Sequence, residues 1–235
     1  MENFMRGVKA GIPIGLGYLS VSFTFGMMAI SAGLTWWEAL LISMLTVTSA
    51  GQFAGLGMMG VPGQSLALLI SQLTINVRYS FMSVALSQNL EPRFSGVYRW
   101  LLGFFMTDEI FAVACGERQV TRSFFAGLAV MPYLGWSGGT LIGALLGGIL
   151  PPSLISALSL AIYGMFIAIV VPDIRTNSKI LVVVLIAAAL SCLFYFVPAL
   201  QGISSGLTIS FSAIIAAVIG AAVFPVKTEK EESAA

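Results

Sequence analysis

Long apolar runs are the feature of this sequence that most restricts what it can fold into. A helix needs roughly 20 predominantly apolar residues to cross the hydrocarbon core of a bilayer. Segments that meet or nearly meet this length lie at about 10–32, 37–60, 63–88, 97–116, 123–148, 152–172, 179–198 and 203–225. Charged residues make up only 9% of the chain, too few to build a water-facing surface. We therefore predict an all-α, polytopic membrane protein with seven to eight transmembrane helices.

The segments are separated by glycine, proline and charged residues, which are typical of turns. We expect residues 1–225 to form a single transmembrane domain. Residues 226–235 are rich in charge and are predicted to form a disordered cytoplasmic tail. The segment at 63–88 is polar in its middle, which favours a kinked or broken helix there.

The distribution of basic residues predicts the orientation of the chain, because cytoplasmic loops carry an excess of Lys and Arg. Eight crossings that start in the cytoplasm place most of them inside: Arg6, Lys9, Arg118, Arg122, Arg175, Lys179, Lys227 and Lys230. Only Arg93 and Arg99 then fall outside. This bias predicts that both termini face the cytoplasm.

A weak internal repeat appears at a spacing of about 115 residues. The residues Tyr18-Leu19, Ser22, Ala29 and Gly33 recur as Tyr133-Leu134, Ser137, Ala144 and Gly148. Duplication of this kind is common in transporters, although apolar sequences also match by chance.

Several classes of function are excluded by what the sequence lacks. It has no histidine, so zinc sites built on His and Ser-His-Asp triads are absent. No phosphate-binding or dinucleotide-binding glycine motif is present, and a net charge of +1 without a basic stripe argues against nucleic acid. Cys115 and Cys192 lie in apolar runs and are expected to be small buried hydrophobes. We predict no enzyme activity, no cofactor and no metal.

The first polar cluster inside an apolar segment runs from Thr46 to Gly55. Gly51 and Gly55 form a pair of small residues that would let another helix approach closely. The alternative is an unwound stretch whose free amides and hydroxyls meet a bound ion or carboxylate. Gln52 favours this alternative, because a helix interface alone does not require an amide at that depth.

A second cluster runs from Gln72 to Tyr79. At about 100° per residue, Gln72, Asn76 and Tyr79 share one helix face, while Thr74 and Arg78 share another. Hydrogen bonding between helices would explain the first face. Arg78 lies too deep to reach the interface, so it must pair with an acid or line a wet cavity.

The third cluster, Thr107-Asp108-Glu109, lies at a depth similar to that of Arg78 if its segment is antiparallel to the one before it. We expect one carboxylate to pair with Arg78. Because adjacent carboxylates point about 100° apart on a helix, the two cannot share one task. Either the ion pair only orients two helices, or the other carboxylate takes up and releases a proton.

Taken together, four motifs in this order resemble the AzlC family. They are Gly11-Ile12-Pro13 with Tyr18, the run Ser49-Ala50-Gly51-Gln52-Phe53-Ala54, the run Ile75-Asn76-Val77-Arg78-Tyr79, and Thr107-Asp108-Glu109. The resemblance extends over nearly the whole chain. At one position the chain departs from the family, which often has His after the Arg where this chain has Tyr79.

The resemblance implies a multi-pass protein of the bacterial inner membrane that exports branched-chain amino acids in exchange for protons. The substrates would be Leu, Ile and Val, with Met as a further candidate, and a small membrane subunit of the AzlD type would be the partner. A membrane scaffold without transport of its own, or an exporter of another small amphipathic solute, is the alternative. We hypothesise that Asp108 or Glu109 couples protons and that the substrate contacts Thr48, Ser49, Gly51, Gln52, Asn76, Arg78 and Tyr79.

Overall fold

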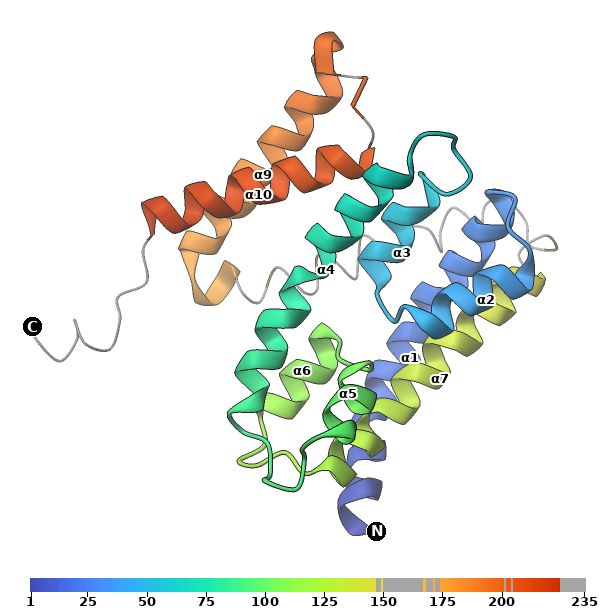
Figure 1. Ribbon diagram of the computed structural model, residues 1–235, viewed down its shortest axis with the longest axis vertical. Coiled ribbons are helices and arrows are strands. Elements are labelled where there is room, and N and C mark those ends of the chain that lie inside the picture. Colours follow the sequence, from blue (N-terminus) through green and yellow to red (C-terminus); the bar gives the residue numbers. More distant parts are fainter. Residues whose placement is uncertain are drawn as a thin grey trace, which may run out of the picture. The chain divides into compact units, whose positions relative to one another are not determined.

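The computed structural model describes residues 1–146, 149, 167, 171, 174–200, 202–203 and 205–224. Within these ranges the protein is helical, and its only β-type pairing is one isolated bridge (Figure 1). The prediction of an all-α fold is confirmed for this part of the chain. Most of the predicted segment 152–172 and the whole tail 226–235 lie outside the described residues.

The chain forms two compact units. The first comprises Met1–Leu56 and Ile75–Met165, and the second comprises Gly57–Thr74 and Phe166–Ala235. In the second unit α9 (Ser178–Phe196) packs against α10 (Ser205–Val223). No residue of α9 is buried, although the helix is almost entirely apolar. Such a helix is stable only where its surroundings are apolar, as they are in a bilayer.

Three of the described helices are long and apolar enough to cross a membrane: α1 (Glu2–Ser31), α7 (Arg122–Leu146) and α9. Helix α4 (Ser65–Ser87) contains 23 residues without interruption. Of the two expected forms, a kinked or a broken helix, the break is therefore absent, and α4 contributes residues to both units.

Helices α1 and α7 lie side by side in the first unit and run in the same direction (Figure 1). Glycines make this contact possible. A Cβ added to Gly135 would lie 2.1 Å from the backbone oxygen of Gly15, and one added to Gly143 would lie 2.0 Å from that of Phe23. Since real side chains cannot approach this closely, only glycine fits, and the two backbones touch along most of their length.

The other predicted segments of the first unit are pairs of short helices. Hairpin A consists of α2 (Trp36–Leu45) and α3 (Ser49–Leu56), and hairpin B consists of α5 (Val97–Gly103) and α6 (Asp108–Cys115). Each of these helices is only about 10–15 Å long at 1.5 Å per residue, about half of the hydrocarbon thickness or less.

Both ends of hairpin A lie at the C-terminal end of α1. Its unwound tip, residues 46–48, packs at mid-helix, where Val47 contacts Tyr18. Further along, Phe53 of α3 meets Phe25 of α1, with ring centroids 5.6 Å apart. Because Phe25 lies closer than Tyr18 to the C-terminal end of α1, α3 returns toward the end at which α2 began.

The first arm of hairpin B, helix α5, follows α7 from the N-terminal end of that helix toward its middle. The guanidinium of Arg122 lies 4.6 Å from the centre of the Tyr98 ring at the start of α5. Beyond the end of α5, the Phe105 ring lies 5.1 Å from that of Tyr133.

The second arm of hairpin B, helix α6, runs back along α1. At its start Glu109 accepts a hydrogen bond from Tyr18, and just beyond its end Glu117 forms an ion pair with Arg6. Hairpin B therefore leaves the membrane on the side where it entered.

Backbone hydrogen bonds join the two loops that flank hairpin B. The Glu91 N–H donates to the Val120 carbonyl at 3.0 Å, and the Val120 N–H donates to the Asn89 carbonyl at 2.8 Å. The Glu91 carboxylate then accepts from the Arg122 N–H at 2.9 Å and so caps the start of α7. Both loops therefore lie at one end of the unit.

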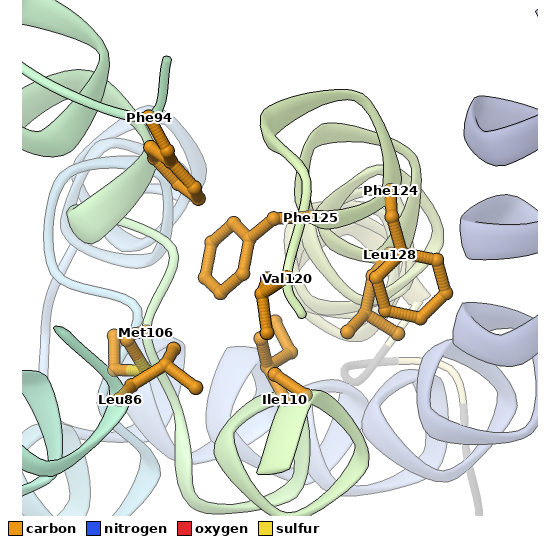
Figure 2. Close-up of a cluster of buried hydrophobic side chains, with 9 residues drawn as sticks. Leu86, Phe94, Met106, Ile110, Val120, Phe124, Phe125 and Leu128 are labelled. Atoms are coloured by element: carbon orange, nitrogen blue, oxygen red, sulfur yellow. The ribbon is translucent and has the colours of Figure 1, made fainter. Parts of the chain in front are cut away.

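A cluster of buried apolar side chains holds hairpin B against α7 (Figure 2). It contains Leu86, Phe94, Met106, Ile110, Ala114, Val120, Phe124, Phe125 and Leu128. The cluster draws on α4, both flanking loops, α6 and α7, so the position of the hairpin depends on all of them.

We call this end of the first unit the basic end, because the N-termini of α1 and α7 and the loops around hairpin B gather basic residues there. They are Arg6, Lys9, Arg93, Arg99, Arg118 and Arg122. The prediction that Arg93 and Arg99 lie on the opposite side is wrong, because the segments at 37–60 and 97–116 turn back instead of crossing. With these two residues at the basic end, the positive-inside rule predicts that this end faces the cytoplasm.

The two cysteines are free and exposed, not buried as expected. Cys115 ends α6 and Cys192 lies on α9, where no residue is buried.

We predict that Gly135→Ala destabilises the protein, because the added Cβ would collide with the backbone of Gly15. Overpacking of this kind costs about 1–3 kcal/mol, measurable as a lower midpoint of thermal unfolding in detergent. Gly138→Ala is the matched control, since nothing lies within 4 Å of its Cβ. Equal midpoints for the two variants would show that α1 and α7 do not approach through Gly135.

We also predict that cysteines placed in both loops around hairpin B react from the same side of the membrane. In a background without Cys115 and Cys192, Ser95→Cys and Gln119→Cys should react with an impermeant maleimide only in inverted vesicles. Ala32→Cys, at the far end of α1, should react only in right-side-out spheroplasts. Labelling of Ser95→Cys in spheroplasts would contradict the hairpin and would indicate that residues 97–116 cross the membrane.

Candidate functional site

The tips of hairpins A and B meet halfway along α1 and enclose a small polar pocket, which we call the central pocket. Its lining comes from both tips and from α1, α4 and α7: Tyr18, Val47, Ser49, Tyr79, Thr107, Asp108, Glu109 and Trp136. The free volume is about 10 Å³, close to the space that one water molecule needs. The pocket is therefore closed to any larger solute in this conformation.

Two helices begin at the central pocket. Helices α3 and α6 both start there and run toward opposite ends of α1, so that their N-terminal N–H groups converge. The hydroxyl of Thr107 caps α6 by accepting from the Ile110 N–H at 3.4 Å. Helix N-termini carry a partial positive charge, which favours the acidic side chains of Asp108 and Glu109 in the first turn of α6.

Arg78 forms an ion pair with Asp108, with 2.7 Å between Nη1 and Oδ2. Its Nη2 donates to the Tyr79 hydroxyl at 3.2 Å, while its buried Nε has no partner among the described residues. This pair confirms the prediction that Arg78 meets one of the two adjacent carboxylates. The pair satisfies a charge that would otherwise be costly at membrane depth.

Glu109 lies in a different environment from its neighbour. Its carboxylate accepts a hydrogen bond from the Tyr18 hydroxyl, and no cation pairs with it in the part of the chain that is described. The Tyr18 ring in turn packs edge-on against Trp136, with centroids 5.4 Å apart. Of the two carboxylates, Glu109 is therefore the one available to a second cation or a proton.

The tip of hairpin A is tied to α4. Here the Thr48 hydroxyl donates to Oδ1 of Asn76 at 2.7 Å. The residues from Thr46 to Thr48 are unwound, which agrees with the second of the two alternatives predicted for the cluster from Thr46 to Gly55. Ser49 opens α3 and faces the central pocket.

A buried chain of hydrogen bonds ties hairpin A to α7. Gln52 donates from Nε2 to the Ser43 hydroxyl at 2.9 Å and accepts at Oε1 from the Trp136 indole at 2.9 Å. Ser43 also shares a hydrogen bond of 2.7 Å with Thr140. All four side chains are almost completely buried. Buried polar groups that are all satisfied in this way define one packing arrangement.

The structure thus separates the predicted site residues into groups. Ser49, Tyr79, Asp108 and Glu109 line the central pocket. Arg78 bonds to two of these residues, Asp108 and Tyr79, while Thr48 and Asn76 bond to each other. Gln52 and Gly51 are buried in α3, and neither lines the pocket.

Sequence reasoning missed Trp136, which lines the central pocket and orients Gln52. It also missed Ser43 and Thr140, which complete the buried chain of hydrogen bonds. One signal was available: an indole N–H inside an apolar, glycine-rich helix needs a buried acceptor.

Two hairpins that bring charged groups together between long apolar helices are typical of membrane proteins of the transporter type. The chain belongs to the AzlC family, since its residues 13–150 match the family described as AzlC protein. This range begins in α1 and extends past α7, so it includes both hairpins and the central pocket.

Similar proteins are all named as membrane proteins. An uncharacterized membrane protein of Archaeoglobus fulgidus is 33% identical over 175 residues, which cover 73% of this chain and 76% of that protein. The inner membrane protein YgaZ of Escherichia coli K12 is 26% identical over 215 residues, covering 87% and 88%. An uncharacterized membrane protein of Helicobacter pylori is 27% identical over 158 residues, covering 63% and 67%. No solved structure matches the chain significantly.

We predict that Arg78 and Asp108 are energetically coupled. Arg78→Met and Asp108→Asn should each lower the unfolding midpoint in detergent, because each leaves an unpaired group. The double variant should lose less free energy of unfolding than the two single variants together, with a coupling energy of about 1–3 kcal/mol. The more exposed pair of Arg6 and Glu117 is the control and should couple by less than about 1 kcal/mol. Additive effects at Arg78 and Asp108 would contradict an ion pair.

Proposed function

We propose that this chain exports branched-chain amino acids across the bacterial inner membrane in exchange for protons. It would do so together with a small membrane subunit of the AzlD type. The observation that carries the proposal is the position of Glu109 where the hairpin tips meet, beside an ion pair and two helix N-termini. No cation in the described part of the chain pairs with it. Membership of the AzlC family and the similarity to an inner membrane protein support the same class of function.

The central pocket offers complementary groups for both charges of an amino acid. The ammonium would bind Glu109 and the nearby hydroxyls, since a carboxylate without a cation attracts a positive group strongly at low dielectric. The substrate carboxylate would approach the start of α3, where Thr48 and Ser49 present hydroxyls and backbone N–H groups. Arg78, Asn76 and Tyr79 hold this arrangement and complete the polar wall.

Proton coupling follows from competition for one carboxylate. An ammonium binds Glu109 only when that carboxylate is deprotonated, so a proton that arrives from the opposite side displaces the substrate. Asp108 would not serve this role, because Arg78 already neutralises it at 2.7 Å. Each cycle then exchanges one cationic group for another without leaving an uncompensated charge in the membrane.

Selectivity among aliphatic side chains should be modest. One methylene in an apolar pocket is worth about 1–3 kcal/mol, which does not separate leucine from isoleucine or valine sharply. The present cavity of about 10 Å³ admits no amino acid, so at least one hairpin tip must move during transport.

The test uses proteoliposomes that contain the chain and its partner subunit, loaded with buffer and given labelled leucine under an imposed pH gradient. The wild type should accumulate leucine, and valine or isoleucine should compete. We predict that Glu109→Gln lowers gradient-driven accumulation at least tenfold and also weakens leucine-leucine exchange, because a neutral amide can neither take up a proton nor attract the substrate ammonium. Arg78→Ala should lose both activities.

Glu2→Gln, at an exposed position in the first turn of α1, is the control and should behave like the wild type. Full gradient-driven accumulation by Glu109→Gln would remove Glu109 from proton coupling. Leucine movement by the partner subunit alone would make this chain a scaffold. If an unrelated amphipathic solute competed and branched-chain amino acids did not, the substrate would have to be reassigned to that solute.

A further inference from the structure

A second and larger pocket lies in the first unit at the basic end. Its volume is about 250 Å³, against about 10 Å³ for the central pocket. The walls are mostly apolar and include Leu86, Phe94, Met106 and Phe125, which Figure 2 shows grouped around hairpin B. This volume fits a solute of amino-acid size and is below the roughly 300–1,000 Å³ of sites for drug-sized ligands.

The polar lining of this pocket favours a carboxylate. Arg99 lies in its wall, and no acidic residue does. Arg99 is held in place because its Nε donates to the Phe94 carbonyl at 2.9 Å. Its two Nη groups have no partner among the described residues, so they remain available as a fork of donors. Ser83 and Ser87 supply hydroxyl groups on another wall.

The tip of hairpin B separates this pocket from the central pocket. Met106 lines the larger pocket, whereas the next residue, Thr107, lines the central one. The residues between α5 and α6 are unwound, so the partition between the two spaces is not a continuous helix. A shift of this tip would connect them.

We propose that the larger pocket is a loading site for small aliphatic carboxylates, above all the branched-chain amino acids. Arg99 binds the carboxylate, the apolar walls take the side chain, and the tip of hairpin B gates passage to the central pocket. This inference rests on the proposed function and adds to it a cytoplasmic subsite with its own ligand chemistry.

Gly103 provides a way to fill the loading pocket without disturbing the fold. It lines the pocket, and a Cβ added to it would meet nothing within 4 Å. Gly103→Leu therefore places apolar volume into the pocket and leaves every charged group intact. Gly17→Leu on α1 is the matched control, because its Cβ also meets nothing within 4 Å and it does not line the pocket.

The experiment measures equilibrium binding of labelled leucine and of labelled 4-methylpentanoate to the purified chain, with and without the partner subunit. Gly103→Leu and Arg99→Gln should weaken binding of both ligands at least tenfold and raise the KM for transport from the basic side. Gly17→Leu should bind and transport normally. Asp108→Asn, which changes a side chain of the central pocket and none of the larger pocket, should retain this binding while transport falls.

Unchanged binding by Gly103→Leu, or loss of binding in Asp108→Asn, would overturn the loading site while leaving the proposed function in place. Loss of the partner subunit from Gly103→Leu with normal binding by the chain alone would assign the pocket to the subunit interface. If wild-type protein with its partner moved no leucine, the proposed function would fail. Binding of 4-methylpentanoate would then still test the loading site separately. If this ligand did not bind, the inference would be overturned.

Discussion

The close parallel contact between α1 and α7 is the constraint on which the first unit depends. Glycines let the two backbones touch, as at Gly135 against Gly15 and Gly143 against Phe23. In a bilayer the hydrophobic effect does not drive helices together, so close packing of small residues is a main source of association. Both hairpins are positioned against the resulting pair of helices. Hairpin A bonds to α7 through Gln52, and hairpin B bonds to α1 through Glu109.

Unwound stretches at membrane depth are tolerated where neighbouring groups supply hydrogen-bond partners. The tip of hairpin A is bonded through Thr48 to Asn76, and the start of α6 is capped by Thr107. Backbone that faced lipid at this depth would leave such groups unsatisfied at a cost of several kcal/mol each. The same breaks direct the N-termini of α3 and α6 toward one another. The unwound stretches that let the hairpins turn therefore also create the polar centre.

Sequence periodicity located the polar clusters but not the path of the chain between them. Arg78 and the Asp108-Glu109 pair stand out because charges inside apolar segments are rare, and their pairing followed from depth alone. A break in α4 was expected where none exists, while the real breaks lie at residues 46–48 and 104–107. Local polarity does not distinguish a continuous helix from an unwound stretch. In both, polar side chains can be satisfied when a neighbouring helix supplies the hydrogen-bond partners. Gln52 shows the same limit, since its amide is used by Ser43 and Trp136 and not by the pocket.

By itself the sequence determined that this protein is helical and membrane-embedded, that it belongs among AzlC-like proteins, and which charged residues lie at depth. These properties follow from apolar run length, charge rarity and motif order, which are local along the chain. Only the tertiary structure decided that residues 37–60 and 97–116 turn back and that Arg93 and Arg99 share an end with Arg6. It also decided that Asp108 has a cation partner whereas Glu109 has none among the described residues. An apolar run of about 20 residues has the same hydropathy whether it crosses or returns, so the difference depends on contacts with helices far away in the sequence.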